Sequence, residues 1–299
     1  MLFRKRTREM LLVAFFLTPA LLVFFVYRIV PLLWNLALSF AFWSPGGSYE
    51  FAGLEHYTEM FVYDDVFRTS FVNTLIYMAS MPLAIVVALF VALLVNARIR
   101  GRNVYRTIVF LSYPMMPVAV GIIWQWLYNE KVGLINYVLQ SAGVIDTPIA
   151  FLNSTALALP SVIVVGMWQI LGFFMIILLT GLQSIPQSLY EAAAIDGAGP
   201  TKSFFRITLP LLRPSLFLCF VIGVISSFTS FDLVYVMTEG GPAHATELLI
   251  TYIYKTAFGL SEFDYAGALT VVMFTLFLSI TLILNRFSGG EAGKVDGAN

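Results

Sequence analysis

Six long apolar runs limit what this 299-residue chain can fold into. A helix needs about 20 mostly apolar residues to cross the hydrocarbon core of a bilayer, and each run reaches that length. The runs cover residues 10–36, 70–95, 107–128, 157–183, 212–236 and 265–286. Inside lipid, only helices and closed barrels satisfy every backbone N–H and C=O group. Barrel strands alternate in polarity over about 10 residues, whereas these runs are apolar throughout. The sequence therefore predicts an all-α integral membrane protein with six transmembrane helices.

The distribution of charge predicts how these helices are oriented. Only 11% of the residues are charged, against about 25% in soluble domains. When the loops are assigned alternately to two sides, 13 of the 17 basic residues fall on one side: Arg4, Lys5, Arg6, Arg8, Arg98, Arg100, Arg102, Arg106, Lys202, Arg206, Arg213, Arg286 and Lys294. Arg68, Lys131 and Lys255 fall on the other side, and Arg28 lies within the first run. Because Lys and Arg accumulate in cytoplasmic loops, we expect both termini in the cytoplasm.

These boundaries divide the chain into three parts. We expect a basic cytoplasmic N-terminus at 1–9, a six-span domain at 10–286 and a cytoplasmic tail at 287–299. The first run is expected to remain as a signal-anchor helix, since its apolar core is longer than that of a signal peptide and no small-x-small cleavage site precedes Arg28. The lone Cys219 provides no intramolecular disulfide.

The loop at 184–213, between the fourth and fifth runs, carries signals for a short helix. Ser188 and Glu191 have the spacing of a capping box, in which Ser188 is the N-cap. Ala192, Ala193 and Ala194 favour continuation of the helix. Gly197 and Gly199 are expected to end it with positive φ angles.

A second short helix is predicted to follow at once. Pro200 suits the first turn of a helix, which would run through Phe204 and Phe205 to Leu209-Pro210. The chain would then re-enter the membrane at Arg213-Pro214. Local chemistry alone is compatible with a simple connecting elbow as well as with a docking element.

The spacing within this loop resembles a known pattern. Glu191-Ala192-Ala193 is followed by Gly197, and ten residues later Ile207 begins Ile-Thr-Leu-Pro, which ends at Pro210. This arrangement resembles the EAA loop of ABC importer permeases. The resemblance implies a coupling helix that docks in a cleft of a cytoplasmic ATPase subunit.

The same resemblance implies a role for each residue of the loop. Glu191 would pair with basic or polar groups of the ATPase, and Ala192 and Ala193 would allow close approach. Asp196 and Gly197 would shape the turn.

A second segment narrows the resemblance. The stretch 231–242, Phe-Asp-Leu-Val-Tyr-Val-Met-Thr-Glu-Gly-Gly-Pro, followed by Ala245-Thr246-Glu247, looks like the end of the fifth span in permeases for sugars and glycerol phosphates. The chain therefore resembles a binding-protein-dependent permease of the maltose type, in a short six-span form.

This resemblance implies a set of partners in a bacterial or archaeal cell membrane. They are a second six-span permease, two cytoplasmic ATP-binding-cassette subunits, an external substrate-binding protein and a sugar. ATP and Mg²⁺ would bind to the partner ATPase subunits, and this chain would bind no cofactor.

A sugar pathway needs hydrogen-bonding side chains and aromatic faces at mid-depth in the membrane. The candidates in the fourth and fifth runs are Trp168, Gln169, Phe173, Ser226, Ser227, Thr229, Ser230 and Asp232, and the third run adds Tyr113, Trp124 and Gln125. A purely structural role remains an alternative for each of them, because Ser and Thr also pack between membrane helices and Trp and Tyr populate membrane interfaces. Gln169 stands out, since an amide deep in an apolar run needs a partner. Asp232 is expected near the outer interface.

The spans supply few cations for an anionic substrate. Arg28 lies near a helix end, where its guanidinium can reach the headgroups. We therefore favour a neutral di- or oligosaccharide, with glycerol-3-phosphate or a glycerophosphodiester as the alternative.

Other classes of function lack their expected residues. The sequence has no Gly-x-x-x-x-Gly-Lys-Ser/Thr, so the chain itself is not expected to bind ATP. His56 and His244 lack the spacing of metal ligands. The sequence also shows no nucleophile–His–acid set of the kind that would indicate an enzyme. The basic residues follow topology and leave no patch for nucleic acid. An ion-coupled secondary carrier, the main rival, normally uses acids or histidines at mid-membrane. None is expected at that depth here, because Asp232, the one acid within the runs, is expected near the outer interface.

Overall fold

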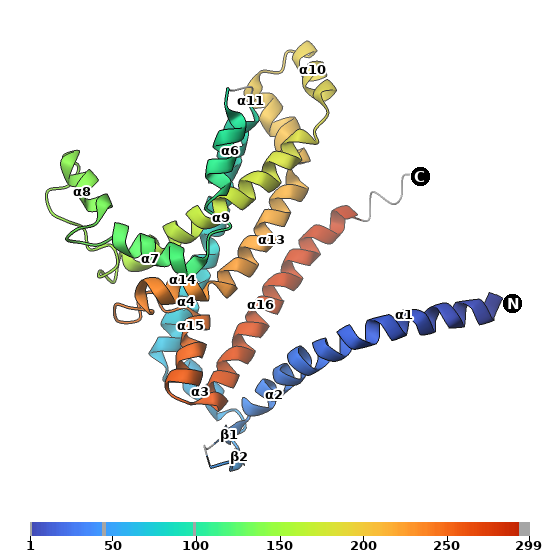
Figure 1. Cartoon of the computed structure of the whole chain (residues 1–299), viewed down its shortest axis with the longest axis vertical. Coiled ribbons are helices and arrows are strands. Elements are labelled where there is room, and N and C mark those ends of the chain that lie inside the picture. Colours follow the sequence, from blue (N-terminus) through green and yellow to red (C-terminus); the bar gives the residue numbers. More distant parts are fainter. Residues whose placement is uncertain (1, 44–45, 98–99, 293–299) are drawn as a thin grey trace. The chain divides into compact units, whose positions relative to one another are not determined.

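The computed structural model describes residues 2–43, 46–97 and 100–292, which form two units. One unit comprises residues 1–64 and 253–276, and the other comprises 65–252 and 277–299. Figure 1 shows the elements of both, which are overwhelmingly helical. Arg98 and Lys294, two of the predicted topology charges, lie outside the described residues, as does most of the predicted tail.

Four helices in the described part of the chain are long and apolar enough to cross a membrane: Leu12–Leu38, Asp65–Asn96, Ala158–Gln183 and Phe263–Leu284. A fifth is counted if Pro200–Leu211 and Arg213–Thr229, which meet at 62°, form one bent span. These helices match five of the six predicted runs. The count of six transmembrane helices stays a prediction.

The first unit begins with a nearly continuous helical stretch. It consists of α1 (Leu2–Phe24), a π-helical turn η1 (Phe25–Ile29) and α2 (Val30–Leu38). An antiparallel hairpin follows, in which β1 (Ala41–Trp43) pairs with β2 (Tyr49–Phe51). The unit also contains α3 (Glu55–Val62), η3 (Lys255–Gly259) and the first part of α16 (Phe263–Ala292).

Polar contacts hold the hairpin in this unit. The backbone N–H of Trp43 donates to Oδ2 of Asp264 over 3.0 Å. Nε2 of the buried His56 lies 3.1 Å from the carbonyl oxygen of Ala41. The hairpin was not predicted, because the alternation of a three-residue strand is too short to detect.

The second unit contains the rest of α16 and the remaining elements, of which α15 has its last two residues in the first unit. They are α4 (Asp65–Ala79), α5 (Met81–Asn96), α6 (Arg102–Phe110), α7 (Pro117–Leu127), α8 (Leu134–Ser141), α9 (Ala158–Gln183), α10 (Gln187–Ile195), α11 (Pro200–Ser203), the π-turn η2 (Phe204–Thr208), α12 (Leu209–Leu211), α13 (Arg213–Thr229), α14 (Phe231–Thr238) and α15 (Leu249–Tyr254).

The predicted third helix, over 107–128, is wrong in its continuity. The chain leaves the helix after Phe110 and resumes helical structure at Pro117. Met116, just before Pro117, has an extended backbone with ψ 127°. Proline disfavours the helical conformation in the residue that precedes it. Pro114 lies within this break, and Pro117 is the first residue of α7, directly after it. The fifth run is also interrupted, at Ser230, between α13 and α14.

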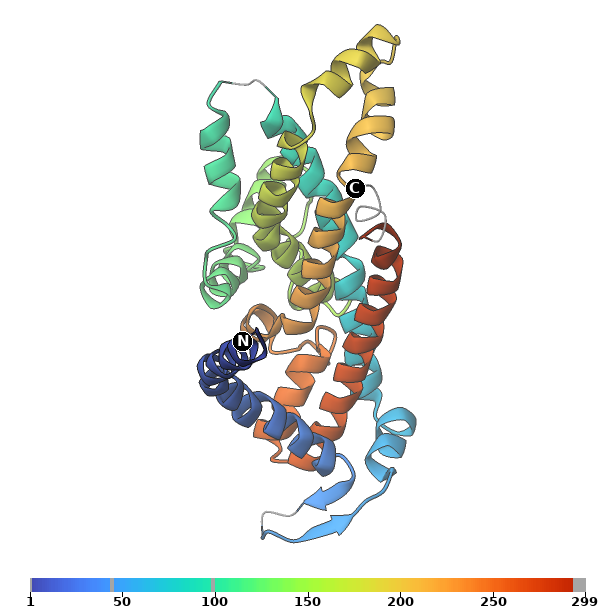
Figure 2. The same ribbon diagram turned by 90° about the vertical axis from the view of Figure 1, so that its right-hand side faces the viewer.

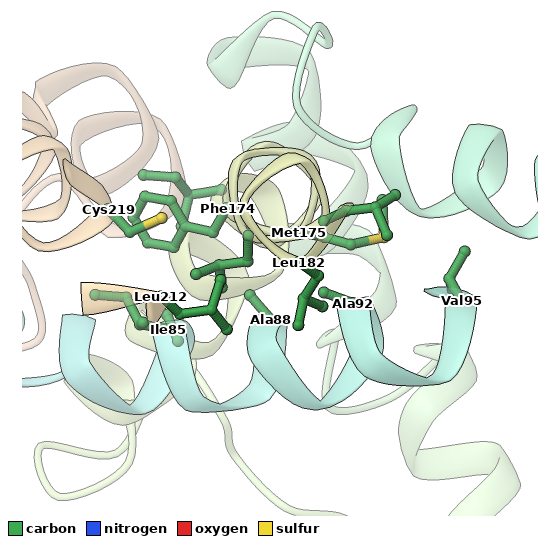
Figure 3. Packing of buried hydrophobic residues seen from close by; sticks show 13 residues of the cluster. Ile85, Ala88, Ala92, Val95, Phe174, Met175, Leu182, Leu212 and Cys219 are labelled. Atoms are coloured by element: carbon green, nitrogen blue, oxygen red, sulfur yellow. The ribbon is translucent and has the colours of Figure 1, made fainter. Parts of the chain in front are cut away.

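The main core of this unit lies where α5 packs against α9. Figure 3 shows Ala88 and Ala92 of α5 facing Met175 and Leu182 of α9. These two alanines, with Ala84, recur every four residues on one side of α5 and are fully buried. Membrane helices lack a hydrophobic driving force between them, so small residues stabilise their packing by letting backbones approach.

Candidate functional site

The loop at 184–213 forms an elbow of two short helical limbs. In Figures 1 and 2, α10 and α11 lie at the end of α9 and α13 that is remote from α14. The first limb, α10, begins at Gln187, after Pro186 in an extended conformation (ψ 131°) and without a side-chain cap. The predicted capping box is therefore wrong: Ser188 already lies inside the helix. The carbonyl of Pro186, which accepts the N–H of Leu189, starts the helix two residues earlier.

The end of α10 has the geometry of a Schellman cap. The N–H of Ala198 donates to the carbonyl of Ala193 over 2.8 Å, and that of Gly197 to Ala194 over 3.1 Å. Gly197 has φ 74°, which confirms its predicted left-handed conformation.

Gly199 differs from the prediction. Its φ is −68° with an extended ψ, and it precedes Pro200 at the start of α11. Its carbonyl accepts the N–H of Ser203 over 3.0 Å. One left-handed residue was enough to end α10, so Gly199 serves the start of the next helix instead.

The second limb returns to the transmembrane part as α11, η2 and α12. It ends at Leu211, and the direction changes by 62° into α13. Leu212, at the bend, is fully buried. Figure 3 shows its side chain close to Ile85 of α5.

Most of the predicted coupling residues are accessible on the elbow. Glu191, Ala192, Asp196 and Gly197 are exposed, and Ala193 is half-buried. Next to them the side chain of Ile195 is 88% exposed.

A cavity of about 400 Å³ lies deeper in the same unit. Its lining comes from α4, α5, the 111–116 break, α7, α9, α13 and α14: Tyr77, Met81, Tyr113, Met115, Pro117, Gly166, Gln169, Ile170, Ser226, Thr229, Ser230, Asp232 and Leu233. Five of the eight predicted pathway residues, namely Gln169, Ser226, Thr229, Ser230 and Asp232, are thus brought together.

The other three predicted residues lie outside this lining. Ser227 is fully buried and donates to the carbonyl of Gly223 over 2.8 Å, which makes it a packing residue. Trp168 packs edge-on against Trp124 at 5.5 Å between ring centres. Phe173 stacks on Tyr113 at 4.4 Å and 8° between ring planes. Phe173 therefore supports an aromatic ring that does line the cavity.

Gln169 holds the broken third segment in place. Its Nε2 donates to the carbonyl of Met115 over 3.0 Å. The hydroxyl of Ser112 reaches back to the carbonyl of Trp168 over 3.2 Å. Non-helical backbone at membrane depth is tolerated where protein groups satisfy it or where it lines a cavity, and both conditions are met here.

Sequence reasoning missed several lining residues. Tyr77 is almost fully buried, and its hydroxyl accepts a bond from Ser230 Oγ over 3.3 Å. Met115 lies in the break, and Pro117 is the first residue of α7. The pair Pro114 and Pro117 was the signal that could have located this non-helical segment.

The charge of the lining is also defined. Asp232 lies in the first turn of α14, where a carboxylate is stabilised by the helix dipole. It is the one acidic side chain among the described lining residues, and none of them is Lys, Arg or His. The structure places Asp232 on the cavity wall, which the sequence indicated only as a candidate position. Its location near the outer interface stays a prediction.

Residues 80–289, which include the elbow and most of the cavity, match the family model described as "Binding-protein-dependent transport system inner membrane component". The chain belongs to this family. It is thus a permease subunit of an ABC transporter and a multi-pass membrane protein, and its predicted resemblance to ABC importer permeases is confirmed.

Individual relatives of this permease match most of its length. A probable ABC transporter permease protein of Bacillus subtilis (strain 168), YurN, is 34% identical over 279 residues, which cover 91% of this chain and 94% of YurN. The sn-glycerol-3-phosphate transport system permease protein UgpA of Yersinia enterocolitica is 35% identical over 244 residues, 81% of each chain. A solved structure of a bacterial ABC transporter involved in the import of the acidic polysaccharide alginate is 25% identical, with a TM-score of 0.83 over 97% of this chain and 99% of that chain.

Proposed function

We propose that this permease and a second six-span permease together form the alternating-access pathway for a sugar delivered by an external binding protein. The observation that carries the proposal is the 400 Å³ cavity, where three hydroxyl side chains, an amide, a carboxylate and two tyrosines meet. Hydroxyl-rich ligands need this mixture of hydrogen-bonding groups and aromatic faces. Discontinuous helices also mark the binding sites of many transporters, and two breaks, at 111–116 and at Ser230, border this cavity.

The elbow is proposed to be the coupling element. Its Glu191, Asp196 and Gly197 would lie at the contact with a cytoplasmic ATP-binding-cassette subunit, of which the transporter would have two. Exposure of Glu191, Asp196 and Gly197 supports this docking role, because these residues remain accessible on the surface of the elbow. ATP and Mg²⁺ would act on the ATPase subunits, so the permease itself would not be an enzyme.

The orientation follows from the same assignment. Six spans in the inner membrane would leave both termini and the elbow in the cytoplasm. The 13 basic residues on the predicted cytoplasmic side support this arrangement.

The substrate is proposed to be an uncharged di- or oligosaccharide. An anion would approach Asp232 without meeting Lys, Arg or His among the described lining residues of the cavity. A second cavity of about 640 Å³ is lined in part by Glu130 and Glu239 and likewise contains no cation among its described lining residues. Glycerol-3-phosphate is the second candidate, because the relative UgpA is an sn-glycerol-3-phosphate permease protein.

Uptake by the complete transporter tests the substrate class. The permease, its sister permease, the ATPase and the binding protein are reconstituted in liposomes, and ATP-dependent uptake of neutral trisaccharides is compared with that of glycerol-3-phosphate and of oligouronates. We expect uptake of a neutral trisaccharide. Uptake of glycerol-3-phosphate without uptake of any trisaccharide would reject the sugar and favour glycerol-3-phosphate as the substrate.

A further inference from the structure

A hydroxyl–hydroxyl hydrogen bond joins the two limbs of the elbow. The phenolic oxygen of Tyr190, on α10, lies 2.8 Å from Oγ1 of Thr208, the last residue of η2. Thr208 is only 5% exposed. Tyr190 immediately precedes Glu191, the proposed docking residue, so the bond fixes α10 to the second limb next to that residue.

Thr208 is in turn connected to the bend. Its carbonyl accepts the N–H of Leu212 over 2.9 Å, one helical turn further along. Leu212 is fully buried in the cluster formed by α5 and α9. The fit is tight, because a Cβ on Gly181 of α9 would approach Leu212 Cδ2 to 2.8 Å. Movement of Thr208 is therefore carried to a side chain that is fixed in the transmembrane core.

The chain itself provides a weaker connection between the limbs. Only residues 196–199, with Gly197 and Gly199, link α10 to α11 along the backbone. A Cβ at either glycine would have no atom within 4 Å, so the turn is not braced by neighbouring side chains. Without a side-chain bond, this turn would absorb part of any displacement of α10.

We propose that Tyr190 and Thr208 are a positioning pair for transport. Their bond keeps α10 at a fixed angle to the bend at Leu212, so that displacement of α10 by the ATPase moves α13 and its cavity-lining residues. This inference rests on the proposed docking role of the elbow and adds the residues that transmit the movement.

The test measures how nucleotide changes access to the cavity. Ser226 of the cavity lining is replaced by cysteine, and its reaction with a membrane-impermeant maleimide is followed in the reconstituted complex, with and without ATP and vanadate. Cys219, the one native cysteine, is buried, so the chain without the Ser226→Cys substitution gives the background.

Tyr190→Phe and Thr208→Val each remove one hydroxyl and keep the shape of the side chain. We expect the nucleotide-induced change in labelling rate to fall about two- to tenfold, as expected for one lost neutral hydrogen bond. Labelling without nucleotide and co-purification of the ATPase should stay unchanged, whereas a general loss of structure would alter both.

The double variant should lose no more of the response than either single variant. Thr208→Ser keeps the hydroxyl and should therefore keep the response. Thr201→Val, at an exposed position on the same limb, is the matched control.

The outcomes separate this inference from the proposed function. A normal nucleotide response in both single variants, or losses that add in the double variant, would reject the positioning pair alone. Absence of any nucleotide response in the complex with only Ser226→Cys would reject the cavity as part of the pathway, and the positioning pair with it.

Discussion

The side-chain amide of Gln169 donates to the carbonyl of Met115 across 3.0 Å, which anchors the break in the third segment to α9. Without this bond the Met115 carbonyl would lose a partner beside the cavity. Ser112, at the start of the break, makes a second attachment to α9 through the carbonyl of Trp168. Gln169 therefore has a structural task as well as a position on the cavity wall.

Replacement of Gln169 by Leu should lower transport more than it lowers the amount of protein in the membrane. One hydrogen bond within a membrane protein contributes about 0.6–2 kcal/mol, which is too little to prevent folding but enough to displace Met115 and Tyr113. ATP-dependent uptake and membrane yield are measured together. Gln183→Leu, at the exposed end of the same helix, is the matched control. Wild-type uptake by Gln169→Leu would show that Gln169 is dispensable for the pathway.

Replacement of Gly197 by Val should weaken attachment of the ATPase without preventing insertion or pairing with the sister permease. Gly197 has φ 74°, and a Cβ there would meet no atom within 4 Å. The cost is thus confined to the backbone, about 1–2 kcal/mol for a left-handed L-residue, and it re-aims α10. Gly199→Val is the matched control, because its φ of −68° suits any residue. Co-purification of the ATPase and substrate-stimulated hydrolysis are measured. Equal attachment in the two variants would count against a docking role for this turn.

Replacement of Glu191 by Lys should have the same effect through charge. Glu191 is exposed on α10, so reversal of its charge leaves the fold unaffected but opposes basic groups on the ATPase. Reduced co-purification, recovered in part by Glu191→Gln, is the expected result. Undiminished attachment of Glu191→Lys would mean that this carboxylate does not face the partner.

A reporter fused after Asn299 should be active only as a cytoplasmic form. This result follows from six spans with the basic loops in the cytoplasm. A second reporter, active only outside the cytoplasm, is fused at the same position after Asn299 and should be inactive. Activity of this second fusion would contradict the predicted topology and the cytoplasmic position of the elbow.

The purified chain alone should neither hydrolyse ATP nor move sugar across liposomes. The sequence contains no phosphate-binding Gly-x-x-x-x-Gly-Lys-Ser/Thr, and one permease would provide only half of the pathway. Hydrolysis of ATP and uptake of a neutral trisaccharide are compared with those of the complete transporter. Uptake by the chain alone, driven by an ion gradient, would favour a secondary carrier.

Local patterns were enough to predict several features of the permease. The helices α5 and α9 follow from apolar length, and the turn after α10 follows from the glycine at 197. The break at 111–116 was missed, although Pro114 and Pro117 mark it, because an apolar run looks the same whether or not the helix continues. The partner of Gln169 could not be predicted either, because Met115 lies 54 residues away in sequence.

The sequence by itself determined that the chain is a membrane protein, and its elbow pattern determined the family, because length, charge and Gly or Pro placement act locally. Only the tertiary structure decided which polar residues face the cavity. Ser226 and Ser227 are adjacent and chemically identical, yet Ser226 lines the cavity and Ser227 is buried against Gly223. Successive residues of a helix point about 100° apart, and the rotation of α13 is set by its close packing on α5, where a Cβ on Gly223 would approach Met81 to 3.0 Å. That packing involves residues far apart in sequence, so no local pattern reveals which serine turns inward.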